Sequence, residues 1–156
     1  MRAVVQRVRG AKLTADGTPK AEIGAGMLIL IGVQPEDTEA EADLLVHKCA
    51  NLRIFEDENG KMNRSPADAG AQVLAVSQFT LYGSCLEGNR PYFGAAARPE
   101  IAEPLYDYFC EQLAKHLPVQ TGVFGADMQI ETTCDGPVTI LMDTDDWKKK
   151  SGGKER

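Results

Sequence analysis

The sequence of 156 residues is poor in the side chains that most enzymes use for covalent chemistry or metal binding. It has two histidines and one tryptophan. His47 and His116 have no metal-type spacing with a cysteine or a carboxylate. The motifs of serine hydrolases, zinc proteases, P-loop proteins and dinucleotide-binding domains are absent from the sequence. We therefore expect no metal, no cofactor and no Ser-His-Asp triad.

The cysteines and the hydrophobic runs exclude two further classes of protein. The four cysteines, at positions 49, 85, 110 and 134, form no Cys-x-x-Cys pair. An even count would suit disulfides in a secreted protein, but the sequence starts with strand-like alternation and not with an export segment. The longest apolar run, residues 27–33, is far shorter than the ~20 residues that cross a bilayer. We expect reduced thiols and a cytoplasmic protein.

The sequence has an overall excess of acidic charge and a basic C-terminal end. The net charge is −6, and residues 148–156, with five basic residues and one acidic residue, contribute +4, which leaves −10 for residues 1–147. Such an acidic body does not suit a protein that coats long stretches of nucleic acid, because that binding needs many phosphate contacts. It still allows recognition of a nucleic-acid end. We predict one domain over 1–147 and a basic, disordered tail over 148–156, which serves solubility or adds weak phosphate attraction.

Hydrophobic periodicity predicts a single α/β domain. Alternating stretches indicate strands over 2–9, 11–14 and 20–23, and the apolar runs 27–33 and 72–81 are typical of buried strands. Thr38 with Glu41 resembles a capping box that begins a first helix, and apolar positions over 99–117 recur at helical spacing. The expected architecture is a mixed, mostly antiparallel, barrel-like sheet with two main helices.

A glycine and a proline in direct succession, Gly136 and Pro137, interrupt the last strand-like stretch. Proline fixes φ and cannot donate to a ladder, so the joint predicts a tight turn between two strands of a hairpin over 128–143, with a peptide bond that can be cis. The alternative interpretation is a rigid loop that presents main-chain atoms to a ligand.

Two short sequences together resemble those of the D-aminoacyl-tRNA deacylases. They are Ser-Gln-Phe-Thr-Leu at 77–81, at the end of an apolar strand, and Asp-Gly-Pro-Val-Thr at 135–139. The resemblance runs from residue 1 to about residue 143 and includes 3–8, 22–30, 53–55, 60–63, 88–93 and 124–128. Either pentapeptide alone is a weak signal, but both in this order and at this chain length are specific.

The resemblance implies an esterase that removes D-amino acids, and glycine, from the 3′-terminal adenosine of tRNA without a cofactor. It implies a homodimer, in which a cis Gly136-Pro137 dipeptide from one subunit enters the pocket of the other and excludes L-amino acids. Arg7 would hold the dipeptide across the interface, and Met128 would support the site. The implied catalytic residues, acting mainly through the backbone of the last two, are Ser77, Gln78, Phe79 and Thr80.

Main-chain chemistry is consistent with the shortage of catalytic side chains. Backbone N–H groups at a strand end can stabilise an oxyanion, and the ribose 2′-hydroxyl lies beside the reacting carbonyl. A rigid main-chain wall would read chirality by shape. Cys134 departs from the family, which usually has Asn at this position. A thiol cannot match the hydrogen bonds of an amide, so the loop must be supported differently.

Two other hypotheses remain open on the sequence. One is a non-catalytic protein that binds the end of a tRNA or DNA. The other is a metal-dependent hydrolase of another small ester, which the missing ligand spacing disfavours.

Overall fold

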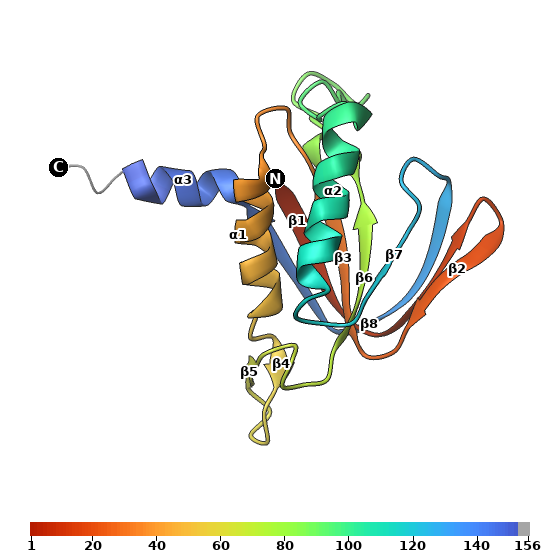
Figure 1. Ribbon diagram of the computed structural model, residues 1–156, viewed down its shortest axis with the longest axis vertical. Helices are drawn as coiled ribbons and strands as arrows, with labels where there is room; N and C mark the ends of the chain where they lie inside the picture. Colours follow the sequence, from red (N-terminus) through yellow and green to blue (C-terminus); the bar gives the residue numbers. More distant parts are fainter. Residues whose placement is uncertain (153–156) are drawn as a thin grey trace.

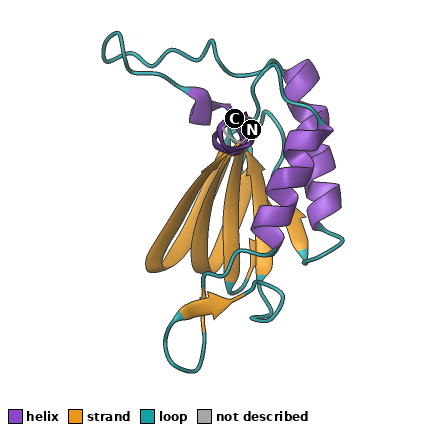
Figure 2. Ribbon diagram, turned by 90° about the vertical axis from the view of Figure 1, so that its left-hand side faces the viewer, coloured by secondary structure: helices purple, strands orange, loops and turns teal. Residues whose placement is uncertain are grey.

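The computed structural model describes residues 1–152, which form a strongly curved, barrel-like sheet with two long helices on one face (Figures 1 and 2). The strand order is β2-β1-β3-β6-β7, and β8 pairs with β1. β1 pairs antiparallel with β2, β3 and β8, whereas β6 runs parallel to β3 and β7. The strands are β1 (Arg2–Ala15), β2 (Thr18–Ile23), β3 (Gly26–Gly32), β6 (Gln72–Ser77), β7 (Val119–Thr121) and β8 (Met128–Asp143), with a separate pair β4 (Phe55–Glu56) and β5 (Met62–Arg64). This confirms the predicted mixed, mostly antiparallel sheet in a single α/β domain.

The helices begin where the sequence predicts. α1 (Glu39–Ala50) has the expected capping box, in which Glu41 Oε2 accepts a hydrogen bond from the Thr38 amide at 2.7 Å. α2 (Pro99–Leu113) starts with a proline at its first position, where no N–H is needed. It ends at Leu113, four residues before the predicted end, and continues as turns to Leu117.

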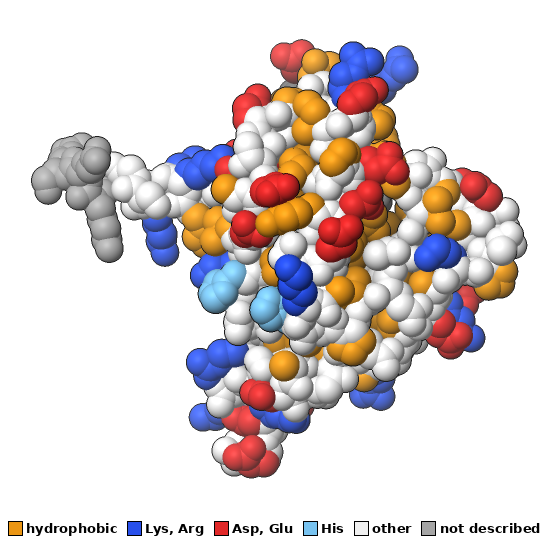
Figure 3. Space-filling view, viewed as in Figure 1, with side chains coloured by type: hydrophobic (Ala, Val, Ile, Leu, Met, Phe, Trp, Pro, Cys, Tyr) orange, Lys and Arg blue, Asp and Glu red, His pale blue; other side chains and the backbone are white. Residues whose placement is uncertain are grey.

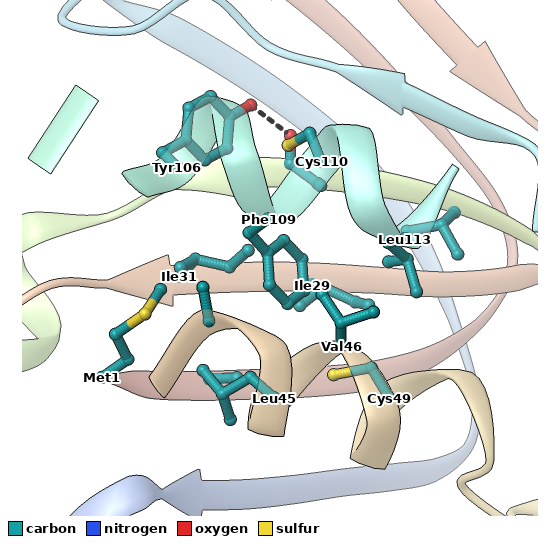
Figure 4. Close-up of a cluster of buried hydrophobic side chains, with 14 of the residues drawn as sticks. Met1, Ile29, Ile31, Leu45, Val46, Cys49, Tyr106, Phe109, Cys110 and Leu113 are labelled. Carbon is teal, nitrogen blue, oxygen red and sulfur yellow. Dashed lines mark hydrogen bonds between the residues drawn. The ribbon is translucent and has the colours of Figure 1, made fainter. Parts of the chain in front are cut away.

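The main core lies between these helices and the sheet. Phe109 and Leu113 of α2, Leu45 of α1, and Ile29 and Ile31 of β3 are all fully buried (Figure 4). The apolar run 27–33 thus forms the central strand, as expected of a run with no polar face.

β1 is continuous through Gly10, where the sequence predicted a break. Its register with β8 shifts on both sides of Val8, as at a β-bulge. Side chains alternate along a strand, so such a shift exchanges the two faces. Val5 therefore faces the helix-covered core, and Leu13 joins a second buried cluster with Leu74.

The predicted hairpin over 128–143 is wrong, because β8 is one strand that follows β1 along its whole length. Gln6 pairs with Thr139 and Val8 with Cys134, so residues 135–138 stand opposite a single residue of β1. The Gly-Pro joint is therefore a bulge. The local sequence cannot distinguish a hairpin turn from a β-bulge, because both need residues that do not take part in the hydrogen-bond ladder.

The tail predicted to be disordered over 148–156 is helical in its described part. α3 (Thr144–Gly152) follows β8 directly and projects from the body (Figure 1). The prediction is wrong for residues 148–152, and residues 153–156 lie outside the described residues. Trp147 packs against the main core, and Lys48 lies 5.6 Å from the centre of its ring. These contacts of Trp147 with residues far away in the sequence stabilise a helix whose own sequence is polar.

The ion pair between Lys148 and Glu41, at 2.9 Å, links α3 to α1. Burial disfavours the charged carboxylate, but hydrogen bonds from Lys148 and Thr38 outweigh this and lower the pKa of Glu41 to about 2. A lowered pKa stabilises the fold above the ordinary value of 4.5, and this stabilisation is lost as the pH falls from there through about 2.

We expect Glu41→Gln to lower the free energy of unfolding at neutral pH by at most about 1 kcal/mol. The loss should shrink on acidification, because below a pH of about 4.5 the unfolded wild-type chain binds a proton at Glu41 that the folded protein does not bind. Urea denaturation at neutral pH and at about pH 3 measures this. Glu39→Gln, in the same helical turn, is the control; an equal loss at both pH values for Glu41→Gln would contradict the expectation.

All four cysteines are free, and burial raises the pKa of the Cys49 and Cys110 thiols to about 12. No helix in the described part of the chain is both long and apolar enough to cross a membrane.

Candidate active site

A pocket of about 580 Å³ opens where β6 ends, at the carboxyl end of the parallel strands β3 and β6. Open α/β sheets commonly bind ligands at this end, and the volume suits a small molecule. Three segments far apart in the sequence form its walls: the end of β6, the start of α2, and the connection from β7 into β8. The lining is mostly apolar and includes Val76, Ser77, Gln78, Phe79, Ala97, Arg98, Ala102, Phe124, Gly125, Met128 and Ile130.

Two unpaired main-chain amides lie beside this pocket. A short 3₁₀ helix, η1 (Phe79–Tyr82), turns the chain directly after β6. The first amides of a helix have no acceptor within it, and within residues 1–152 the amides of Phe79 and Thr80 have no protein acceptor. The preceding amide, that of Gln78, still donates to Ile31 O at 2.7 Å. Two adjacent free main-chain donors can stabilise an oxyanion that lies within hydrogen-bond reach.

Arg2 fixes η1 to the sheet. Its Nη1 donates to Leu81 O at 2.8 Å, and its Nε pairs with Asp143 at 2.9 Å. The guanidinium also lies 4.4 Å from the centre of the Tyr82 ring. Burial raises the pKa of Tyr82, so its phenol is neutral. The free amides are therefore held on a rigid turn.

The side chains near these amides form no nucleophile with a base. Among the described residues that line the pocket, Arg98 is the one charged side chain, so the Ser77 hydroxyl has no general base beside it. The Thr80 hydroxyl accepts a hydrogen bond from Gln78 Nε2. No group of three His, Cys, Asp or Glu residues within 1–152 could hold a metal ion.

Arg7 holds the bulge of β8. Its side chain is 7% exposed, and it donates from Nε to Asp135 O at 3.2 Å and from Nη1 to Ile54 O at 2.7 Å. The carboxylates of Asp135 and Glu56 lie 3.4 Å and 3.9 Å from the guanidinium. We expected Arg7 to act across a dimer interface, and these contacts lie within one chain. The bulge is thereby tied to β1 and to the segment that enters β4.

The tip of this bulge is exposed and depends on glycine. The Gly136–Pro137 peptide bond is cis, and both residues are exposed. Gly136 has φ +121°, which L side chains rarely adopt, and a Cβ placed there would lie 2.9 Å from Val138 Cγ2 and 3.2 Å from Arg7 Nη2. No larger residue fits this position unchanged.

The bulge and the pocket lie far apart within one chain. Arg7 pairs with Met27, which is level with Val73, four residues before Ser77. Three strand spacings also separate β8 from β6. Neither Gly136 nor Pro137 is among the residues that line the pocket. Figure 1 shows β4, beside the bulge, at the opposite end of the molecule from the point of the β6 arrow.

The predicted site residues therefore form two groups. Ser77, Gln78, Phe79 and Met128 line the pocket, with Thr80 adjoining them through Gln78, whereas Arg7 lies with Gly136 and Pro137. Sequence reasoning did not assign the start of α2 or Asp135 to a site. The one sequence feature that could have indicated the pocket wall at the start of α2 is the pair of aromatic residues, Tyr92 and Phe93, in the polar loop before this helix.

These features define a single-domain α/β protein with a mostly apolar pocket next to two free main-chain amides. The chain belongs to the family described as D-Tyr-tRNA(Tyr) deacylase, whose model matches residues 4–143. A protein of Parabacteroides distasonis named D-aminoacyl-tRNA deacylase is 52% identical over 92% of this chain and 97% of its own length. A protein of the same name from Symbiobacterium thermophilum is 57% identical over 93% and 97%.

Solved structures have the same fold. One described as c-Myc DNA Unwinding Element Binding Protein has a TM-score of 0.86 and 45% identity, over 92% of this chain and 98% of that one. A second, described as a probable eukaryotic D-amino acid tRNA deacylase, has a TM-score of 0.76 at 18% identity, over 91% and 98%, and shows likeness of fold alone.

Proposed function

We propose that this protein hydrolyses the ester bond between a D-amino acid, or glycine, and the 3′-terminal adenosine of tRNA. The observation that carries the proposal is the pair of free amides at Phe79 and Thr80 beside an apolar pocket of suitable size. Membership of the deacylase family and the names of its members support the same activity. The substrate is a soluble tRNA of the translation machinery, so the proposed location is the cytoplasm.

The proposed reaction needs no side-chain nucleophile. Water attacks the ester carbonyl, the amides of Phe79 and Thr80 bind the developing oxyanion, and the bond from the carbonyl carbon to the ribose 3′-oxygen breaks. The neighbouring 2′-hydroxyl relays the proton to this leaving oxygen. The products are the free amino acid and tRNA, and the protein contributes preorganised donors and exclusion of bulk water.

The proposed active site contains residues from two subunits. Within one chain the exposed Gly136–Pro137 tip is not part of the pocket lining, so in this proposal the tip that contacts a bound substrate comes from a second copy. In the proposed homodimer each tip enters the pocket of the other subunit. Its main chain then occupies the space that an L side chain would need, while a D side chain points away.

The direct test compares D-tyrosyl-tRNA with L-tyrosyl-tRNA at equal concentration in the presence of a chelator. We expect hydrolysis of the D-ester to be at least about 100-fold faster, which corresponds to about 2.7 kcal/mol of discrimination. Equal rates on both esters, or hydrolysis of neither, would contradict the proposal. Loss of activity on chelation would indicate a metal-dependent hydrolase.

A second candidate function is binding of a nucleic-acid end without catalysis. The similarity to a structure described as a DNA unwinding element binding protein favours it. Figure 3 shows acidic and basic side chains interspersed over the helical face, with no continuous basic surface. Tight binding of uncharged tRNA or DNA by a protein that cleaves neither ester would establish this alternative.

Thr80→Val tests whether the main chain or the hydroxyl acts. The variant keeps the Thr80 amide and removes the hydroxyl that accepts from Gln78. We expect kcat on D-tyrosyl-tRNA to fall by less than about tenfold, because only the position of Gln78 is affected. Loss of all turnover with an unchanged thermal midpoint would show that the hydroxyl is the nucleophile. Ser77→Ala is the matched control for the other hydroxyl at the pocket.

A further inference from the structure

We propose that an exposed aromatic and basic surface at the pocket mouth binds the single-stranded nucleotides that precede the terminal adenosine of tRNA. We call it the rim surface, and it consists of Phe79, Tyr92, Phe93, Arg90 and Arg98. The inference rests on the proposed function for its substrate, but binding tests it separately from catalysis.

Aromatic rings are exposed at the rim surface although the chain has few of them. Phe79 is 55% exposed, Tyr92 70% and Phe93 38%. Phe79 and Phe93 both line the pocket and pack edge to face, with ring centres 5.3 Å apart. Exposed aromatic rings beside a pocket are suited to stacking on unpaired bases, which works for any base because each has a π-face.

The backbone holds Tyr92 in place although its ring is exposed. The amides of Ser84 and Tyr92 each donate to the carbonyl of the other at 2.8 Å. The Tyr92 ring lies against the main chain of Gly94, where a Cβ would be 1.9 Å from the tyrosine oxygen. A ring fixed in this way loses little freedom when a base stacks on it.

The rim surface also carries two unpaired cations. Arg90 and Arg98 are exposed and form no ion pair within residues 1–152. Residues 84–98, with Glu87 as their one acidic residue, have a net charge of +1 in a body of −10. Basic side chains lie among acidic ones at the upper end of the molecule, which this loop and the start of α2 form (Figures 1 and 3). A phosphodiester is the anion that would pair with them at this place.

The position of the rim surface identifies the occupant. The pocket holds the terminal adenosine in the proposed reaction, so the preceding phosphate and base must leave through its mouth. The acceptor end of tRNA is single-stranded there, and its bases are free to stack. Aromatic rings for the bases and arginines for the phosphates match this strand.

The test compares two substrates that differ only in these nucleotides: D-tyrosyl-tRNA and D-tyrosyl-adenosine. We expect Arg98→Gln and Tyr92→Leu each to raise KM for the tRNA about tenfold more than KM for the adenosine ester. Arg98→Gln should also reduce the salt dependence of tRNA binding by about 0.7 in the slope of log K against log salt concentration. Lys61→Gln, which removes an exposed charge near β5 at the far end of the molecule, is the matched control.

Equal effects on both substrates, or no effect on either, would overturn the inference. If the wild-type protein cleaves neither substrate, the proposed function fails but the inference is still decided by fluorescence titration with uncharged tRNA. Weaker binding by Arg98→Gln and Tyr92→Leu than by Lys61→Gln would support the rim surface. Identical binding by all three would overturn it.

Discussion

Gly136→Ala is expected to lower the ratio of D- to L-tyrosyl-tRNA hydrolysis by about 100-fold. The added Cβ would lie 2.9 Å from Val138 Cγ2 and 3.0 Å from Val138 N, at a φ of +121° that alanine rarely adopts. The main chain must therefore move. If this movement reduces the difference in activation free energy between the D- and L-esters by about 3 kcal/mol, the ratio falls by roughly 100-fold. Single-turnover hydrolysis of both esters measures the ratio.

The matched control is Gly70→Ala, at another glycine of positive φ with open space around its Cβ position. It should lower stability slightly and leave the ratio as in the wild type. An unchanged ratio in Gly136→Ala, with the far-UV spectrum and the molecular mass in solution of the wild type, would show that the Gly136–Pro137 tip does not select the substrate.

Arg7→Lys is expected to reduce kcat/KM on the D-ester by about 100-fold while keeping the charge. The guanidinium reaches Asp135 O and Ile54 O at the same time, with the Asp135 carboxylate at 3.4 Å. A lysine has a single ammonium group, which cannot reproduce the planar set of N–H donors of the guanidinium. One buried carbonyl is then left without its charged donor, at a cost of about 2–3 kcal/mol.

Arg9→Lys is the control for Arg7→Lys. Arg9 also lies near the Asp135 carboxylate, at 3.5 Å, but its side chain is 76% exposed. Its substitution should change kcat/KM by less than about threefold, because exposed ion pairs contribute little. A loss of less than about threefold in Arg7→Lys as well would show that the positive charge near Asp135 is sufficient and that the geometry of the guanidinium is not needed.

The local parts of the fold could be predicted from the sequence. The Thr38–Glu41 capping box, the start of α2 at Pro99 and the buried strand 27–33 each depend on residues that are neighbours in the chain. Local propensity and hydrophobic period are sufficient for such elements. The candidate site residues were proposed by resemblance, and most of them lie in two short continuous stretches, 77–81 and 135–139.

The two largest errors concern contacts between residues that are distant in the sequence. The Gly-Pro joint satisfies the chemistry of a turn and of a bulge equally well, and pairing of both halves of β8 with β1 makes it a bulge. Residues 148–152 look disordered by composition, yet Trp147 reaches the core and Lys148 reaches Glu41. Sequence patterns carry no information on such partners.

By itself the sequence determined most of the helices and strands and the family. Only the tertiary structure decided where the groups lie. It places the free amides of Phe79 and Thr80 at a pocket whose other walls come from α2 and β8, and it places Gly136 and Pro137 outside that pocket, on the exposed bulge. The physical reason is that strand pairing and packing join residues far apart in the chain, so the relative position of two motifs is a property of the folded sheet.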